Sequence, residues 1–175
     1  MRNLILILTI LFTISSCDKV DELTKFDLEY NSKVVVPGAT GINLPFNMVT
    51  PDMETNSESK FEVNDTRKDL IEEIKLTELR MVITAPTDAD FSFLNSVEVY
   101  ISAEGLDEIK IAEKEVAEDA GNTLDVDVLD IDLKEYIKKD EFNLRLNTVT
   151  DEVINEDHEI DVNTTFFVDA KILGL

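Results

Sequence analysis

Apolar and polar residues alternate with a period of two along most of this chain. The clearest case covers residues 159–172, where the even-numbered positions carry apolar side chains or threonine. The odd-numbered positions there are charged or polar, with Phe167 as the apolar exception. Such alternation is typical of a β-strand with one face buried and the other in water. We therefore expect a strand over 159–172 whose even-numbered side chains face the core.

The same alternation recurs in shorter segments, which predict about eight strands in all. The other seven cover residues 26–36, 42–48, 79–83, 97–103, 109–111, 124–128 and 142–148. Turn-forming pairs separate several of them, including Pro37-Gly38 and Glu104-Gly105. Pro45 should confine the 42–48 strand to a sheet edge, because proline has no N–H to donate to a ladder.

Helical spacing is confined to two short segments. A threonine cap and apolar residues at Leu70, Ile71 and Ile74 predict a helix within 66–74. A capping box at 132–135, followed by Tyr136 and Ile137, predicts a second one. The polar stretch 50–60 has no periodicity and is expected to be a loop.

A strand with a single apolar face must bury that face against a second layer, and the helices that parallel sheets need between strands are missing. We therefore predict an all-β fold, a two-sheet antiparallel sandwich of about eight strands with two short helices. It is immunoglobulin-like in general architecture and forms a single domain over residues 24–175. The length of 175 residues allows one domain with a substantial core.

The chain is strongly acidic, with 16 Lys and Arg against 38 Asp and Glu and a formal net charge of -22. A field of this sign repels nucleic acid and anionic lipid headgroups, so we expect no nucleic-acid partner.

The first residues have the three-part layout of a secretory signal. One positive charge at Arg2 precedes an apolar run over 4–14, and two serines then lead to Cys17, the only cysteine. The run is too short for a transmembrane helix, which needs ~20 residues. Ile14-Ser15-Ser16-Cys17 resembles the lipobox of bacterial lipoproteins.

The lipobox resemblance implies that residues 1–16 are a cleaved signal and that Cys17 carries fatty acyl chains such as palmitate on its sulfur and its new amino group. Several acyl chains anchor a protein durably, at ~0.8 kcal/mol per buried CH₂. Residues 17–23 would then form the acylated tether. The acidic residues at 18–22 resemble surface-export signals of some Gram-negative lineages, whereas Asp18 marks inner-membrane retention in others. We expect the cell envelope, and the outer membrane within it.

Catalytic patterns are poorly represented, and no enzyme activity is expected. His158, the only histidine, is expected at the surface, and no G-x-S-x-G elbow accompanies it. Asp125 and Asp127 share a predicted strand face that points to solvent, with nothing to raise one carboxyl pKa as a carboxylate-pair hydrolase requires.

Cofactors are not expected either, although oxygen ligands two residues apart make Asp88 and Asp90 calcium candidates at the end of a strand. The chain lacks an EF-hand pattern, and turn-forming aspartates explain both residues without a metal.

Three further segments look similar to uncharacterised envelope lipoproteins of Gram-negative bacteria, namely 66–71, 91–103 and 132–137. That resemblance implies a sandwich and brings no site residues. The leading hypothesis is a non-catalytic module that binds an unknown protein or glycan, or has a structural role, through end loops or exposed aromatics such as Tyr100 and Phe167. The alternative is a carboxylate-dependent hydrolase of an envelope or extracellular polymer, assisted by calcium.

Overall fold

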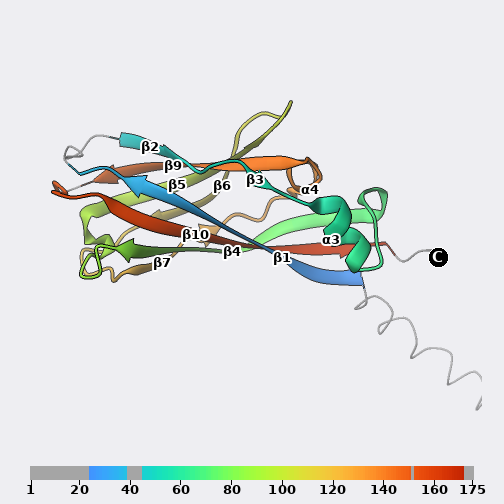
Figure 1. The fold of residues 1–175 in the computed structure, drawn as a ribbon, viewed down its shortest axis with the longest axis horizontal. Coiled ribbons are helices and arrows are strands. Elements are labelled where there is room, and N and C mark those ends of the chain that lie inside the picture. Colours follow the sequence, from blue (N-terminus) through green and yellow to red (C-terminus); the bar gives the residue numbers. More distant parts are fainter. Residues whose placement is uncertain (1–23, 39–44, 151, 172–175) are drawn as a thin grey trace, which may run out of the picture.

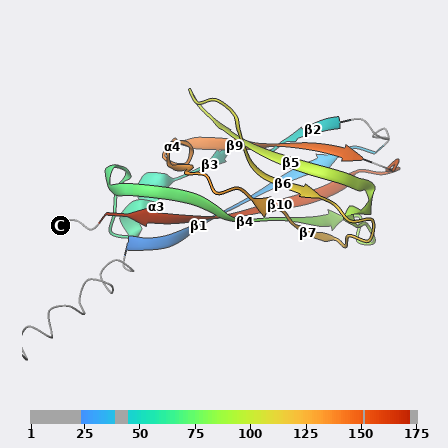
Figure 2. The same cartoon turned by 180° about the vertical axis from the view of Figure 1, so that it is seen from behind.

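The protein is a sandwich of two antiparallel β-sheets, with two short helices at one end (Figures 1 and 2). The computed structural model describes residues 24–38, 45–150 and 152–171. The prediction of an all-β, two-sheet sandwich is confirmed. No helix within the described ranges is both long and apolar enough to cross a membrane.

The smaller sheet has four strands in the order β1-β10-β4-β7. Their bounds are Lys25–Val36 for β1, His158–Ala170 for β10, Ile71–Ala85 for β4 and Thr123–Asp125 for β7. The first and last long strands of the chain pair along their whole length, from Lys25 opposite Asp169 to Val36 opposite His158. Both ends of the domain therefore lie at the same end of the sandwich, beside the helix α3 (Figure 1).

The larger sheet has six strands in the order β2-β9-β5-β6-β8, with β3 pairing β9 on the same side as β2. Their bounds are Pro45–Val49 for β2, Met53–Glu54 for β3, Leu94–Ala103 for β5, Ile109–Glu115 for β6, Asp127–Val128 for β8 and Glu141–Thr150 for β9. β2 is an edge strand, as Pro45 predicts; residues 42 and 44 of the predicted strand lie outside the described residues.

The core is built from the alternating inner faces of both sheets. In β10 every even-numbered side chain from His158 to Ala170 is buried, as predicted, and Ile172 lies outside the described residues. Tyr30 and Phe166 of the small sheet meet Phe142 of the large one edge to face, with ring centroids 5.2 to 5.8 Å apart. Each such pair contributes ~0.5–1.5 kcal/mol beyond its buried area.

The predicted helix within 66–74 is wrong: only a single 3₁₀ turn, Lys68–Leu70, precedes β4. Its helix-like spacing of three arises because β4 carries three register shifts against β10, two of which lie between Ile71 and Leu79. Each of these two shifts inserts one extra residue into β4, so that Ile74 follows Ile71 and Leu79 follows Leu76 as the next buried position. A β-bulge shifts the alternation of a strand by one residue in this way.

The segment predicted as one strand over 124–128 contributes to both sheets. Its first part, β7, pairs β4, and β8 pairs β6 across the sandwich. The Leu129 N–H then donates to the Ile111 carbonyl oxygen (2.8 Å), and the Leu133 N–H returns to the Ile74 carbonyl oxygen (2.7 Å). This segment therefore covers edges of both sheets, which would otherwise expose unpaired backbone groups.

The predicted loop at 50–60 is wrong: this stretch contains the short strand β3 and the start of the helix α3, Ser57–Val63. α3 packs against the start of β1, where the rings of Phe61 and Phe26 lie 6.2 Å apart and the Lys60 ammonium lies 3.7 Å from the centre of the Tyr30 ring. The second helix, α4 (Lys134–Ile137), forms where the sequence predicts it and buries Tyr136 and Ile137.

The capping of α4 differs from the predicted box. Its N-cap residue, Leu133, makes no side-chain cap bond. Asp132 instead accepts from the backbone N–H of Ile74 at 3.2 Å and from that of Lys134 at 3.1 Å. Its second carboxylate oxygen lies 2.9 Å from the Lys134 ammonium. One carboxylate therefore joins the helix α4 to β4.

Candidate functional site

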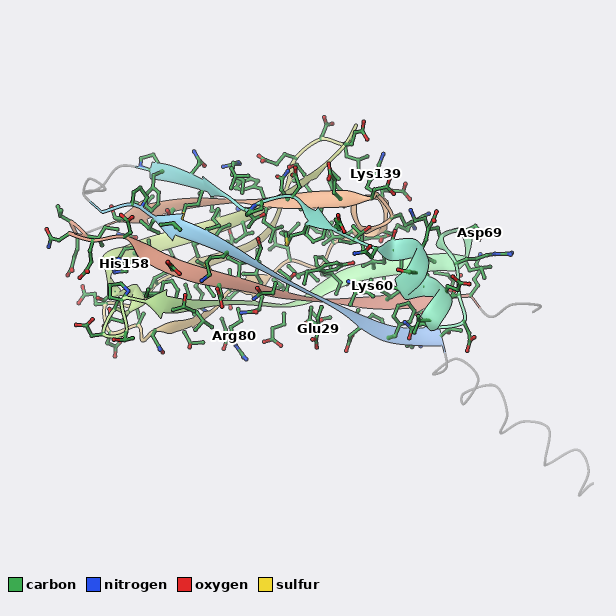
Figure 3. All side chains as sticks on the ribbon, viewed as in Figure 1. Glu29, Lys60, Asp69, Arg80, Lys139 and His158 are labelled. Atoms are coloured by element: carbon green, nitrogen blue, oxygen red, sulfur yellow. The ribbon has the colours of Figure 1, made fainter. Side chains whose placement is uncertain are left out.

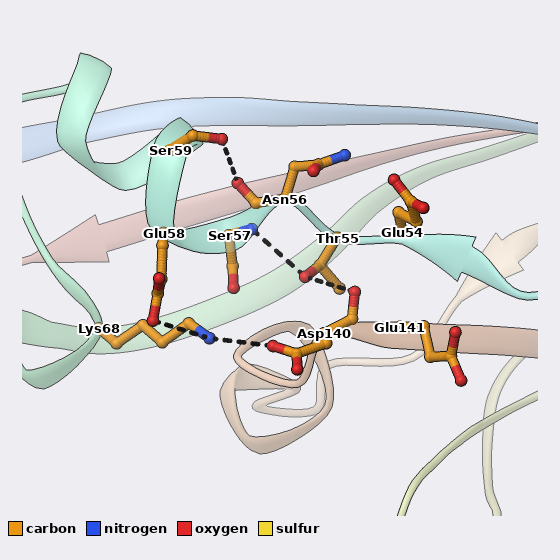
Figure 4. A pocket seen from close by; sticks show the side chains of 9 residues that line it. All are labelled: Glu54, Thr55, Asn56, Ser57, Glu58, Ser59, Lys68, Asp140 and Glu141. Carbon is orange, nitrogen blue, oxygen red and sulfur yellow. Dashed lines mark hydrogen bonds and ion pairs between the residues drawn. The ribbon is translucent and has the colours of Figure 1, made fainter.

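A polar pocket lies at the end of the sandwich where β3, α3, the 3₁₀ turn before β4 and the start of β9 meet (Figure 4). Its volume is about 430 Å³. Four carboxylates, four hydroxyl or amide residues and one lysine line it: Glu54, Glu58, Asp140 and Glu141; Thr55, Asn56, Ser57 and Ser59; and Lys68.

Thr55 holds the walls of this pocket together. Its side chain is fully buried, and its hydroxyl donates to the Lys139 carbonyl oxygen at 2.5 Å, where α4 leads into β9. The same oxygen accepts from the Ser57 N–H at the start of α3 (3.3 Å). The Tyr30 hydroxyl donates to the Thr55 carbonyl oxygen at 3.0 Å. β1, α3 and the start of β9 are thus fixed relative to one another.

Ser57 presents an unsatisfied hydroxyl in this pocket. The residue is only 2% exposed, and its Oγ finds no hydrogen-bond partner among the described residues. Its side chain points into the space framed by Glu58, Lys68 and Asp140 (Figure 4). A buried hydroxyl without a partner costs free energy and is rare in native proteins, so it calls for an explanation.

The pocket has more negative than positive charge. Lys68 forms two long ion pairs, 3.9 Å to Glu58 and 3.7 Å to Asp140. Glu54 and Glu141 lie directly opposite each other on β3 and β9, and neither carboxylate forms an ion pair or hydrogen bond with the residues that the structure describes. Like charges placed opposite each other on paired strands repel. The arrangement is suited to a cationic group.

A second cluster lies on the outer face of the large sheet and is internally satisfied. The Arg145 guanidinium lies 4.2 Å from the centre of the Tyr100 ring, donates to both oxygens of Glu108 at 2.6 to 3.0 Å, and donates to the Asn47 side chain at 2.6 Å. These bonds lower the pKa of Glu108 and raise that of Arg145. Tyr100 is therefore half-buried with Arg145 over its ring, and the predicted exposed aromatic is wrong there.

Phe167 is likewise half-buried, between Asp27 of β1 and Lys75 of β4 in the register of the small sheet. Lys75 forms ion pairs with Glu73 and Asp130 in that region. The outer face of the small sheet is thus mostly charged and offers no aromatic platform around Phe167.

His158 is buried, so its predicted surface position is wrong. It is 8% exposed, its ring centroid lies 5.0 Å from that of Phe93, and its Nδ1 lies 3.0 Å from the Glu156 carbonyl oxygen. The alternation of β10 explains the burial, because position 158 belongs to the same inward set as Ile160. His158 lies at the opposite end of the sandwich from Lys60 and α3 (Figure 3).

The calcium candidates lie near that far end, in the turn after β4. Asp90 caps a 3₁₀ turn, accepting from the Ser92 hydroxyl (2.6 Å) and N–H (3.0 Å), and these bonds lower its pKa. Asp88 is exposed. Within the described ranges, no three acidic, histidine or cysteine side chains are grouped so that they could hold a metal ion.

Asp125 and Asp127 are not a facing carboxylate pair. They belong to β7 and β8, in different sheets, and each has its own cation: Arg80 at 2.6 Å from Asp125 and Lys114 at 3.0 Å from Asp127. Cys17, the predicted lipidation site, lies outside the described residues.

Sequence comparisons identify no family. No protein-family model matches the chain, and no curated protein sequence matches it. Among solved structures, the acidic stable capsid of Helicobacter pylori bacteriophage KHP30 is similar, at 8% identity and a TM-score of 0.36, covering 85% of this chain and 98% of that one.

Two other solved structures are also similar. Desmodium yellow mottle tymovirus matches at 8% identity and a TM-score of 0.26, covering 86% of this chain and 85% of that one. A carbohydrate-binding module of the β-sandwich superfamily matches at 13% identity and a TM-score of 0.27, covering 84% of this chain and 55% of that one. Similarities this low carry no argument about function.

The pocket was missed by sequence reasoning, which treated 50–60 as a loop. A weak signal is visible once the structure is known: Met53, Thr55 and Ser57 are buried and alternate with the exposed Glu54 and Asn56. That alternation marks a segment with an inward face, although polar side chains occupy two of its three inward positions.

Proposed function

We propose that this protein is an envelope lipoprotein, anchored to the outer membrane through acylated Cys17, and that its sandwich is a non-catalytic binding module. The lipobox Ile14-Ser15-Ser16-Cys17 supports the anchor. The ligand site is the acidic pocket around Ser57. The observation that carries this assignment is the Ser57 hydroxyl, buried and without a partner in the described part of the chain, in a pocket whose carboxylates outnumber its lysines.

The position of the pocket is consistent with this proposal. β1 begins beside α3, so a tether attached before Lys25 joins the domain at the pocket end (Figure 1). The pocket would then face the space next to the membrane, and the His158 end would point away from it.

The anchor is tested by intact-mass measurement on protein extracted from its native host. We expect a polypeptide that begins at Cys17 and carries the mass of fatty acyl chains. Cys17→Ser should abolish acylation, whereas Ser16→Ala keeps a small residue before the cysteine and should be processed normally. A retained leader, or an unmodified Cys17 in the wild type, would contradict the anchor.

The binding site is tested by photo-crosslinking in the host. A photo-reactive amino acid at Ser59, which is exposed and lines the pocket, should give an adduct on irradiation. The same amino acid at Asp119, in the exposed loop after β6, serves as the control. Equal adducts at both positions, or none at Ser59, would argue against the pocket.

Catalysis is tested separately, by incubating the full-length protein with isolated peptidoglycan and envelope polysaccharide. We expect no release of reducing ends. Turnover that disappears in Glu54→Gln/Glu141→Gln would favour the carboxylate hydrolase instead.

A further inference from the structure

We propose that the pocket around Ser57 receives a lysine side chain from a basic segment of another protein. The inference rests on the proposed binding function and names its ligand class. It follows from the charge of the pocket, the unsatisfied hydroxyl and the behaviour of the chain's own Lys68.

The charge of the lining favours a cation. Four carboxylates and a single ammonium give the pocket a formal charge of about −3, from the residues named above. Glu54 and Glu141 occupy paired positions on β3 and β9, and neither carboxylate has an ion-pair partner among the described residues. A cation placed between them relieves that repulsion, whereas an anion increases it.

The hydroxyl favours a donor with several N–H groups. An ammonium carries three N–H donors and no acceptor, so one can be given to Ser57 Oγ while the others reach carboxylates. The pKa of a lysine ammonium, ~10.4 in the unperturbed state, keeps it charged at neutral pH. Ser57 would then act as a hydrogen-bond acceptor for which the described residues of the domain supply no donor.

Lys68 shows that an ammonium fits between these walls. It lies between Glu58 and Asp140, at 3.9 and 3.7 Å, distances longer than a direct hydrogen bond (Figure 4). Both carboxylates are exposed, and exposed ion pairs of this length contribute little to stability. An incoming lysine can therefore displace Lys68 or share its carboxylates at little cost.

The surroundings favour a segment over a free amine. Glu141 also lines an adjoining acidic hollow with Asp52 and Glu104. A second adjoining hollow carries Lys138 and Lys139 beside its acidic residues, so its charge is nearly balanced. The hollow with Asp52 and Glu104 extends the acidic surface from the Ser57 pocket along the end of the large sheet. Residues that flank the inserted lysine can lie along it, and the net charge of -22 favours approach of a basic partner.

A metal ion is the competing occupant. A hard cation such as calcium needs 6–8 oxygen ligands at once. In the described chain, no group of three acidic side chains is placed to hold one. The ammonium needs fewer ligands and tolerates the spread of carboxylates around this pocket.

The test uses the full-length protein in non-ionic detergent and a fluorescein-labelled peptide, acetyl-Gly-Gly-Lys-Gly-Lys-Gly-Gly, at about 0.15 M salt, where non-specific long-range attraction is screened. Fluorescence anisotropy gives the dissociation constant. The companion peptide carries Nε-acetyllysine at both lysine positions, which removes the charge and keeps the chain length.

We expect saturable binding of the lysine peptide and at least tenfold weaker binding of the acetylated one. Ser57→Ala should weaken binding about tenfold, the size of one hydrogen bond to a charged group. Glu54→Gln/Glu141→Gln should weaken it at least as much. The matched control Glu118→Gln/Asp119→Asn removes the same charge from an exposed loop and should change it less than twofold.

Three results would overturn the proposal. The first is an equal loss of binding in the pocket and control variants, which indicates attraction by net charge alone. The second is no binding of the lysine peptide by wild-type protein up to about 1 mM. The third is a calcium-dependent rise in melting temperature that disappears in Glu54→Gln/Glu141→Gln, which makes the pocket a metal site.

The proposed binding function is judged by the Ser59 crosslink, which does not depend on the chemistry of the ligand. A crosslink at Ser59 without lysine-peptide binding therefore leaves the binding module in place and removes only the ligand class. Circular dichroism of each variant confirms that it is folded before its binding is compared.

Discussion

Replacing Ser57 with alanine should make the protein more stable. Most substitutions at buried positions are destabilising, so the expected sign is itself a strict test. Ser57 is buried at the start of α3, and its Oγ has no partner among the residues that the structure covers. Alanine removes that oxygen and keeps the backbone N–H that donates to Thr55.

The magnitude follows from the cost of an unsatisfied buried group, ~1–3 kcal/mol. The gain should lie at the low end, about 1 kcal/mol, because the residue lines a pocket that solvent can enter. No large cavity forms, since the change removes a single oxygen atom. For a domain of this size, a gain of 1 kcal/mol raises the melting temperature by about 2–4 °C.

The assay is urea unfolding of the full-length protein followed by circular dichroism, because the chain has no tryptophan to report by fluorescence. Thr66→Val is the matched control: Thr66 Oγ1 is the other buried side-chain oxygen without a partner among the described residues, and it does not line the pocket. Both variants should gain stability, whereas only Ser57→Ala should lose lysine-peptide binding. A loss of about 1 kcal/mol in Ser57→Ala would show that its hydroxyl is satisfied, and the reasoning would fail.

Three further predictions concern the sandwich itself. Phe166→Ala should lose ~3–5 kcal/mol in urea unfolding, because this fully buried ring is in contact with both sheets, and a loss below about 1 kcal/mol would contradict its central role. Gly38→Ala should lower the melting temperature, because a Cβ there would lie 2.9 Å from the Glu156 Cα; an unchanged value would refute the close approach. Asp132→Asn should destabilise most at neutral pH: burial raises the pKa of Asp132, but hydrogen bonds led by that from Lys134 outweigh it and leave the pKa lowered. The stability that the ionised Asp132 contributes is present above its unfolded pKa of ~3.9 and is lost as pH falls through the lower folded value. The unfolding curves of wild type and variant should therefore converge in acid. A stability difference that stays constant with pH would contradict this.

The fold was largely predictable because strand faces are encoded locally. In β1, β5, β9 and β10 the alternation of side chains predicts both the strand and its buried face, and the structure agrees. His158 continues the same alternation one residue before the predicted strand and is buried, although its polar neighbours led to the prediction of a surface position. There, strand register outweighed the polarity of the local sequence.

The errors occurred where pairing with a distant strand changes the local pattern. The register shifts in β4 depend on its alignment with β10, and two of the three give apolar spacings that resemble a helix. The switch between sheets at 125–127 depends on both β4 and β6, and nothing in the five residues 124–128 distinguishes it from one strand.

The sequence by itself determined the class of fold, the inward faces of the long strands and a candidate lipid anchor at Cys17, because periodicity and short motifs depend on adjacent residues. Only the tertiary structure decided which strands pair, where β4 bulges, and that Thr55, Ser57, Lys68 and Glu141 line one pocket. Those residues come from distant segments, and Thr55 and Glu141 are 86 positions apart in the sequence. Their proximity depends on the packing of the whole sandwich, and no local pattern records it.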